Sequence, residues 1–230
     1  MEPIAEVVQQ QFTRLESMRN ATEPCVQPET ECLECKGVGY VVERGAAHPC
    51  RCTIERRIRA ILPERFHRAS LRDFQGERLE TAEAWLRNPT NGLFIPGEPG
   101  TGKTYLAAAI VRALVESRRQ VQFRRAAQFF FEIRQAFHNN SSESLILDPL
   151  TSVRVLVLDD LGAGSLSDFE RRSTLELLDC RWNALRPTIV TSNWTLQKIS
   201  DLMDDRIASR LASFTTLKLV GEDWRVRCAS

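Results

Sequence analysis

Residues 97–104 read Gly97-Glu98-Pro99-Gly100-Thr101-Gly102-Lys103-Thr104. This stretch matches the pattern G-x-x-x-x-G-K-[ST] at every position, follows the apolar run 93–95 and opens an apolar helical stretch, as the pattern requires. The glycines let backbone N–H groups approach phosphate oxygens, and the positive end of the helix attracts them. We therefore expect all of these residues to bind nucleotide phosphates, with Lys103 on the β- and γ-phosphates and the Thr104 hydroxyl on Mg²⁺.

Two further apolar runs end in polar side chains. Residues 155–158 lead directly into the carboxylates Asp159 and Asp160, which is the form of a Walker B strand. In such a strand the first acid supports Mg²⁺, and the second polarises the attacking water as a base. Residues 188–192 lead to Asn193, whose amide at the carboxyl edge of the neighbouring strand could hold that water near the γ-phosphate. The predicted catalytic residues are thus Lys103, Asp159, Asp160 and Asn193.

Apolar runs and helical patterns alternate from about residue 62, which predicts a parallel sheet with helical crossovers. The expected strands span 92–96, 121–124, 154–158, 187–191 and 215–219. The expected helices span 103–117, 126–137, 168–184 and 196–212, the last with a break near Asp204. The central runs lack polar alternation, as strands buried on both faces do. The predicted fold class is therefore α/β, with a five-stranded parallel sheet between helices, and the polar stretch 139–144 is expected to be a mobile loop.

Four cysteines form two close pairs ahead of this region, Cys32-x-x-Cys35 and Cys50-x-Cys52. Zn²⁺ takes four thiolates in a tetrahedral arrangement, and such a site can fold a segment that is too short for its own core. The single residue within the second pair weakens the pattern, and His48 or the more distant Cys25 are alternative ligands. We expect one structural zinc ion on the four paired cysteines, in an element that shapes a surface for a protein partner.

The N-terminal region differs in character from the rest of the chain. Residues 1–20 show apolar side chains at helical spacing, prolines interrupt the pattern, and an Arg-rich helix is expected over 53–62. We therefore predict a boundary after residue 61. Residues 1–61 would form an N-terminal helix and zinc-binding element, and residues 62–230 would form the domain with the phosphate loop.

The overall composition excludes several classes of protein. The net charge of +1 provides no overall field that would attract nucleic acid or a membrane surface. With 43% hydrophobic and 27% charged residues, the chain is neither fibrous nor disordered. It has no apolar run long enough to span a membrane, and its N-terminus lacks the apolar core of a secretory signal. We therefore expect a cytoplasmic protein with reduced cysteines and no membrane partner.

The three nucleotide-site elements, in this order and spacing, resemble those of AAA+ ATPases. Residues 62–227 are similar to the DnaC/DnaI-type helicase loaders and to the related IstB-type transposition helpers. The stretches that carry this resemblance are Leu62-Pro63-Glu64-Arg65-Phe66, Asp159-Asp160-Leu161-Gly162, Thr191-Ser192-Asn193 and Asp205-Arg206-Ile207-Ala208-Ser209-Arg210-Leu211. The chain ends soon after the fifth expected strand, so that, as in the loaders, no C-terminal lid is expected.

The resemblance implies roles for several side chains. Asn193 would be the sensor I residue, and Arg210 would be the arginine finger that neutralises charge on the phosphoryl group of a neighbouring subunit's ATP. Arg206 lies one helical turn earlier and is the alternative finger. The closing segment 223–227 is similar to that of the loaders and implies that Arg225 is sensor II. Self-association through ATP at subunit boundaries follows from these roles.

The resemblance also implies a site for single-stranded DNA. The loaders hold DNA through an aromatic residue ahead of the Walker B strand and through Ser and aromatic residues just after it. The matching positions are Phe137, Ser167 and Phe169. Aromatic side chains stack bases of single strands, and nearby arginines bind the phosphates. We therefore expect these three residues to bind DNA.

These features together imply an ATP-hydrolysing helicase loader of DNA replication that uses ATP, Mg²⁺ and Zn²⁺. Its implied partners are a hexameric replicative helicase and single-stranded DNA in the bacterial cytoplasm, whether the gene is cellular or carried by a phage. Two alternatives stay open. One is an IstB-like ATPase that delivers a transposase to target DNA, and the other is a zinc-bearing adaptor that binds ATP as a switch with negligible turnover.

Overall fold

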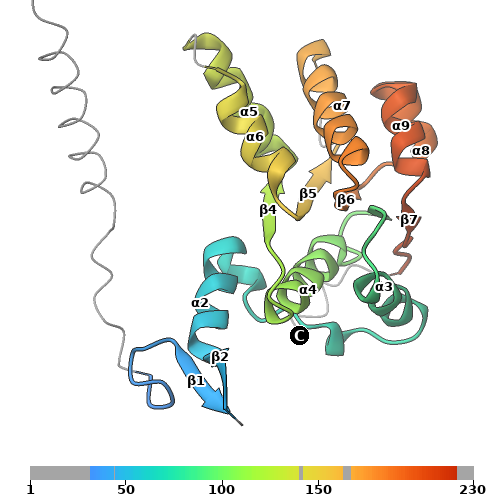
Figure 1. Ribbon diagram of the computed structural model, residues 1–230. Coiled ribbons are helices and arrows are strands. Elements are labelled where there is room, and N and C mark those ends of the chain that lie inside the picture. Colours follow the sequence, from blue (N-terminus) through green and yellow to red (C-terminus); the bar gives the residue numbers. More distant parts are fainter. Residues whose placement is uncertain (1–31, 44, 140–141, 163–166, 222–230) are drawn as a thin grey trace, which may run out of the picture. The chain divides into compact units, whose positions relative to one another are not determined.

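The computed structural model describes residues 32–43, 45–139, 142–162 and 167–221 (Figure 1). The helix expected over residues 1–20, Cys25 and Arg225 lie outside the described residues. Contacts within the chain separate two compact units, 1–53 and 54–230. This division falls within helix α2 (Arg51–Ile61), ahead of the boundary that we predict after residue 61.

A two-stranded antiparallel hairpin organises the described part of the first unit. Strand β1 (Tyr40–Glu43) pairs with strand β2 (Ala46–Pro49), a pairing that the sequence pattern does not predict. At the base of the hairpin, the Gly39 carbonyl accepts hydrogen bonds from the Cys50 N–H at 2.8 Å and from the Thr53 hydroxyl at 2.9 Å. These bonds bring the segment before the hairpin next to the first turn of α2.

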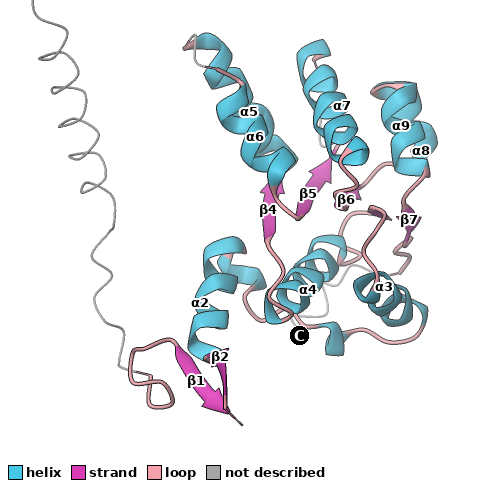
Figure 2. Cartoon of the chain, viewed as in Figure 1, coloured by secondary structure: helices cyan, strands magenta, loops and turns pink. Residues whose placement is uncertain are grey.

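The second unit is a parallel sheet between two layers of helices (Figure 2). Its strands are β3 (Leu93–Pro96), β4 (Val121–Arg125), β5 (Val155–Leu161), β6 (Thr188–Ser192) and β7 (Thr215–Thr216). Its helices after α2 are α3 (Glu77–Arg87), α4 (Lys103–Glu116), α5 (Ala126–His138), α6 (Ser144–Ser152), α7 (Asp168–Asn183), α8 (Leu196–Leu202) and α9 (Asp205–Ala212). The strand order β4-β5-β6-β3-β7, with every pair parallel, confirms the predicted five-stranded parallel sheet.

Alternate residues of the central strand β5 enter opposite layers of the core. Val155 and Val157 belong to the apolar cluster that includes α3 and α4, whereas Leu156 and Leu158 belong to the cluster that includes α5 and α7. Figure 1 shows these two groups of helices on opposite faces of the sheet. All four side chains are fully buried. The central strands are apolar without alternation because both faces are covered.

The structure contains two helices that the sequence pattern does not predict, α3 and α6, and its last strand is shorter than expected. Helix α6 begins at Ser144 and carries Pro149 in its interior, where proline ordinarily signals a helix end. Strand β7 contains only two residues, and pairing resumes at an isolated bridge between Gly97 and Leu219. The strand expected over 215–219 is therefore interrupted.

The break that we expect near Asp204 is confirmed. Helix α8 ends at Leu202, and the Asp204 carboxylate accepts a hydrogen bond from the Arg206 N–H at 2.7 Å. This bond satisfies one of the unpaired donors at the N-terminus of α9. Within the described ranges, no helix combines the length and the apolar character that a membrane crossing requires.

Candidate functional site

The phosphate loop is a tight turn between β3 and α4. The Gly97 N–H donates a hydrogen bond to the Ser192 carbonyl of β6 at 3.1 Å. A Cβ atom at Gly97 would lie 2.4 Å from the Leu219 carbonyl oxygen, so no larger residue fits there. Gly102, at the N-terminus of α4, has a φ of +90°, which glycine adopts without strain. The turn itself thus requires these glycines, and it presents the first N–H groups of α4 for an external acceptor.

Lys103 is held over the phosphate loop. It is the first residue of α4 and only 7% of its surface is exposed. Its ammonium group donates hydrogen bonds to the carbonyls of Gly97 at 2.8 Å and Glu98 at 2.7 Å. Phosphate oxygens are stronger acceptors for an ammonium group than neutral carbonyls are. The loop, its lysine and the positive end of α4 therefore fit the phosphates of a nucleotide.

The Asp159 carboxylate joins the phosphate loop to β6. Its Oδ1 accepts hydrogen bonds from the Thr104 hydroxyl at 2.9 Å and from the Thr191 hydroxyl at 2.7 Å. Burial raises the pKa of Asp159, and the two hydroxyl groups act against that shift. Carboxylate and hydroxyl oxygens are ligands that Mg²⁺ accepts beside nucleotide phosphates. Thr104 and Asp159 thus fit the magnesium role that the sequence predicts for them.

Asp160 and Asn193 meet at the carboxyl edge of the sheet. The Asn193 amide donates a hydrogen bond from Nδ2 to the Asp160 Oδ1 at 3.2 Å. Asp160 has a φ of +61°, and its N–H donates to the Thr191 hydroxyl at 2.8 Å. One threonine hydroxyl therefore orders both acids of the site. Sequence reasoning assigned Thr191 no role, and its place directly before Ser192 and Asn193 is the signal that could have found it.

Contacts of Ser192, Gly162 and Trp194 connect the end of β5 to the end of β6. The Ser192 hydroxyl donates to the Leu161 carbonyl at 2.6 Å and accepts from the Trp194 N–H at 3.0 Å. Gly162 has a φ of +91°, and a Cβ atom there would lie 2.5 Å from the Trp194 ring. The ring thus packs directly on the Gly162 backbone. This contact, which sequence reasoning also missed, holds Asn193 and the Asp160 turn in one relative position.

The two candidate finger arginines have partners within their own chain. Arg210 donates from Nε to the Asp179 Oδ1 at 2.5 Å, and its guanidinium group lies over the Trp182 ring at 4.4 Å from the centroid. Arg206 pairs with Asp204 at 3.1 Å. Among the described residues, neither guanidinium group has a hydrogen bond or ion pair with the phosphate loop. Their action on a neighbouring subunit stays a prediction.

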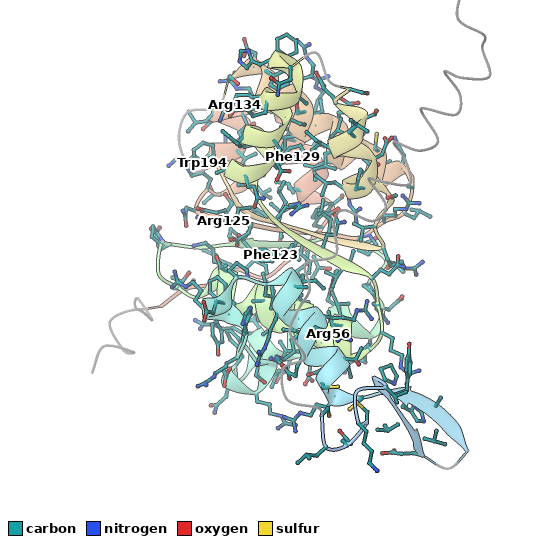
Figure 3. The ribbon with its side chains drawn as sticks, turned by 90° about the vertical axis from the view of Figure 1, so that its left-hand side faces the viewer. Arg56, Phe123, Arg125, Phe129, Arg134 and Trp194 are labelled. Carbon is teal, nitrogen blue, oxygen red and sulfur yellow. The ribbon has the colours of Figure 1, made fainter. Side chains whose placement is uncertain are left out.

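The three expected DNA-binding residues lie at the ends of two helices. Phe137 of α5 and Phe169 of α7 have ring centroids 5.7 Å apart, and 63% of the Phe137 surface is exposed. Ser167 caps α7, because its hydroxyl accepts from the Glu170 N–H at 3.3 Å. The Glu170 carboxylate also pairs at 3.0 Å with Arg134. Arg134 lies toward the C-terminal end of α5, as Phe137 does (Figure 3). The structure thus brings the two aromatic rings together beside a fixed helix start.

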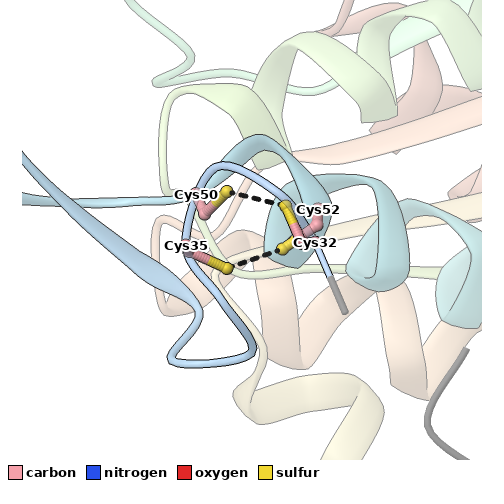
Figure 4. Close-up of side chains that lie close together, drawn as sticks. All are labelled: Cys32, Cys35, Cys50 and Cys52. Carbon is pink, nitrogen blue, oxygen red and sulfur yellow. Dashed lines mark hydrogen bonds between the residues drawn. The ribbon is translucent and has the colours of Figure 1, made fainter. Parts of the chain in front are cut away.

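The four paired cysteines form one cluster in the first unit (Figure 4). The cluster consists of Cys32, Cys35, Cys50 and Cys52, whose sulfur atoms all lie within 4.8 Å of one another. A tetrahedral zinc ion with Zn–S bonds of about 2.3 Å separates its sulfurs by roughly 3.8 Å. The observed distances are 3.7 Å from Cys32 to Cys50 and 3.5 Å from Cys35 to Cys52. The donor set and its spacing therefore fit a four-thiolate metal site.

The electrostatics of this cluster favour a thiolate at its first member. Backbone hydrogen bonds from Cys35 and Glu34 lower the pKa of Cys32 to about 7. Metal ions bind the thiolate form of cysteine. The turn after Cys32 thus favours a thiolate at this sulfur, whereas the pKa of Cys50 is raised and the pKa of Cys52 is raised by its hydrogen bond with Cys35 and by burial.

We expect the purified protein to contain one Zn²⁺ per chain, and we expect Cys50→Ser to lose most of it. Chelation should loosen residues 32–53 and leave the second unit folded, because neither of its apolar core clusters includes these sulfurs. Elemental analysis and circular dichroism would measure both effects. Cys180→Ser, at an exposed position of α7, is the matched control. Absence of zinc from protein purified without chelator would contradict this prediction.

The sheet order, the phosphate loop and the two acids of β5 define an ATP-binding domain of the AAA+ type. The sequence family described as IstB-like ATP binding protein matches residues 67–214. The chain therefore belongs to this family. The matched range includes every residue that we assign to the nucleotide site, namely 97–104, 159–160 and 193.

The similar proteins come from replication and from an insertion sequence. The replicative helicase loader DnaC of Escherichia coli K12 is 31% identical over 116 residues, which cover 50% of this chain and 47% of DnaC. The ATP-binding protein of insertion sequence IS1162 from Pseudomonas fluorescens is 33% identical over 108 residues, covering 47% of this chain and 46% of that protein. This chain thus spans about half the length of the curated relatives that it matches.

A solved structure of a relative shares the fold. The crystal structure of the DnaC helicase loader superposes with a TM-score of 0.61 at 26% identity. The match covers 69% of this chain and 100% of that one. The similarity to DnaC therefore holds for the fold as well as for the sequence.

Proposed function

We propose that this protein is an ATP-hydrolysing helicase loader of DNA replication, which binds a replicative helicase and single-stranded DNA and is switched by ATP. Similarity to the DnaC loaders supports the class. The observation that carries the DNA-binding part is the contact between the rings of Phe137 and Phe169, two residues from separate helices. Paired aromatic rings at a surface offer a platform on which bases of a single strand stack.

Hydrolysis would divide the work among the residues of the candidate site. Lys103 and the phosphate loop hold the β- and γ-phosphates, and Thr104 with Asp159 holds Mg²⁺. Asp160 accepts a proton from the attacking water, which Asn193 helps to orient. Arg210 from the next subunit would neutralise charge on the phosphoryl group, and Arg225 is proposed as sensor II.

One connection in the chain carries both the nucleotide site and the DNA site. Strand β5 contains Asp160, and α7 opens with Ser167 and Phe169 shortly afterwards. The contact between Gly162 and Trp194 anchors the start of this connection to the end of β6. We propose that ATP binding at Asp160 influences DNA binding at Ser167 and Phe169, because these residues lie close together in the chain.

The zinc element is proposed as the surface for the helicase. Its described part exposes apolar side chains, with exposed fractions of 96% at Leu33, 73% at Val38 and 75% at Val42. Exposed apolar groups gathered on a small element commonly mark a protein–protein interface. The zinc ion would hold this surface in shape, because residues 32–53 contribute few buried apolar side chains of their own. Residues 1–61 would then act together as the partner-binding region.

Phe169→Ala and Phe137→Ala should each weaken binding of an oligodeoxythymidine, since loss of one base stack costs roughly 1–3 kcal/mol. Fluorescence anisotropy in the presence of a non-hydrolysable ATP analogue would measure the change. The matched control is Phe131→Ala, because Phe131 is an exposed phenylalanine of the same helix α5 outside the ring pair. Equal weakening by Phe131→Ala, or unchanged binding by both test variants, would show that the ring pair does not stack bases.

A second candidate is a transposition helper, which the insertion-sequence relative favours. Such a helper would capture a transposase and prefer duplex target DNA. Measuring the affinity of the full chain for a hexameric replicative helicase and for a transposase from the same cell would separate the two functions. A protein that hydrolyses ATP in a single turnover and then stops would instead be an ATP-switched adaptor.

A further inference from the structure

A cavity of about 440 Å³ lies between α7 and the connection from α8 to α9, apart from the nucleotide site. Its lining comprises Asp168, Arg171, Arg172 and Leu175 from α7, together with Met203, Asp204 and Arg206. Three guanidinium groups and two carboxylates therefore face one space. The charged side chains outnumber the apolar ones, which favours a charged ligand over an apolar one.

The two carboxylates of the cavity are already paired. Asp168 accepts from Arg171 at 3.3 Å, and Asp204 accepts from Arg206 at 3.1 Å. Arg172 is exposed and has no hydrogen bond or ion pair within the part of the chain that the structure describes. The lining thus carries three guanidinium groups and two carboxylates, an excess of one positive charge that favours an anionic ligand.

The Arg171 side chain has one hydrogen-bond donor without a partner among the described residues. Its Nε is buried and finds no hydrogen-bond partner among the described residues. A buried donor without a partner costs free energy. A rearrangement in which this guanidinium group donates to an oxyanion would therefore be favoured.

The neighbours of the cavity favour a DNA phosphate as the oxyanion. Arg172 follows Phe169 by three residues, and side chains at this spacing are neighbours on a helix surface. Phe169 in turn contacts Phe137, on which we propose that bases stack. Aromatic rings beside arginines are the combination that holds the bases and the backbone of a single strand. An acidic protein segment would use the arginines but not the adjacent ring pair.

We propose that this cavity is a subsite for a backbone phosphate of single-stranded DNA, with Arg172 as its contact and Arg171 and Arg206 beside it. The proposal rests on the proposed function, because it places the phosphate next to bases stacked on Phe137 and Phe169. Asp168 and Asp204 position two of the guanidinium groups through their ion pairs. The subsite would extend the path of the strand from α5 across the first turns of α7 toward α9.

The test is the salt dependence of oligodeoxythymidine binding by the full chain, with a non-hydrolysable ATP analogue present. Each phosphate contact contributes about 0.7 to the slope of log affinity against log salt concentration for single strands. Arg172→Gln should therefore weaken binding roughly tenfold at low salt and lower the slope by about 0.7. Arg172→Lys should keep the slope, because the charge remains.

Two controls separate the subsite from other effects. Arg87→Gln removes an exposed arginine from the last turn of α3, outside the cavity, and should leave both affinity and slope unchanged. Phe169→Ala should weaken binding without changing the slope, because stacking releases no counterions. The unfolding temperature of each variant verifies that the fold is intact.

An unchanged slope and affinity in Arg172→Gln, with DNA binding by the unaltered protein, would overturn the subsite and leave the proposed function standing. Loss of helicase binding alone by Arg172→Gln would also overturn the DNA subsite. That result would indicate that the cavity binds an acidic protein segment. Absence of single-stranded DNA binding by the unaltered protein would overturn the DNA part of the proposed function and the subsite with it.

Discussion

Asp160→Asn is expected to bind ATP as the unaltered protein does and to lose turnover by about 10²–10⁴-fold, the contribution typical of a general base. The reason is that Asp160 would act on the attacking water and not on the bound phosphates. Lys103→Ala is expected to lose ATP binding itself, because the buried ammonium group would contact phosphates already in the ground state. Binding of a fluorescent ATP analogue and single-turnover hydrolysis would measure the two effects separately.

The matched control for the lysine is Lys218→Ala, an exposed lysine outside the phosphate loop. It should bind and hydrolyse ATP normally. Full turnover by Asp160→Asn would mean that another group activates the water. Normal ATP binding by Lys103→Ala would mean that the backbone of the loop holds the phosphates without the lysine.

Arg210→Ala is expected to bind ATP normally and to fail in hydrolysis. Loss of an arginine finger costs roughly 10³–10⁵ in rate in well-studied phosphoryl-transfer enzymes. The structure adds a reason for the choice of Arg210, because its guanidinium group lies over the Trp182 ring, which orients it. A preorganised cation stabilises the transition state without the cost of ordering it during the reaction.

Mixing two inactive variants distinguishes a finger from a residue that serves its own subunit. Arg210→Ala supplies an intact phosphate loop, and Lys103→Ala supplies an intact finger. Interfaces that combine the two should therefore recover part of the hydrolysis. No recovery in a mixture shown to co-assemble, or normal hydrolysis by Arg210→Ala alone, would place the finger elsewhere, with Arg206 as the next candidate.

The ion pair of Arg210 allows a further control. If Arg210 only fastens α9 to α7, then Asp179→Asn should reduce hydrolysis as severely as Arg210→Ala does. If Arg210 acts on a neighbouring subunit, Asp179→Asn should keep most of the activity, because the guanidinium group remains stacked on Trp182. Steady-state hydrolysis of both variants at equal protein concentration would decide between these roles.

The sequence by itself determined the features whose cause is local. The phosphate loop is one continuous stretch, and its glycines are required by the turn that they form, as Gly97 and Gly102 demonstrate. The central strands are recognisable because burial on both faces demands continuous apolar residues. The start of α9 is recognisable because Asp204 caps it from within the same few residues.

The tertiary structure decided which distant residues meet. Asp160 contacts Asn193, and Phe137 contacts Phe169, only because β5 lies beside β6 and α5 lies near α7. It likewise decided that α6 continues through Pro149 and that β7 stops after two residues. Arg206 likewise joins Arg171 and Arg172 at the cavity only because α9 packs against α7. This grouping depends on packing between elements, so no local pattern of residues predicts it.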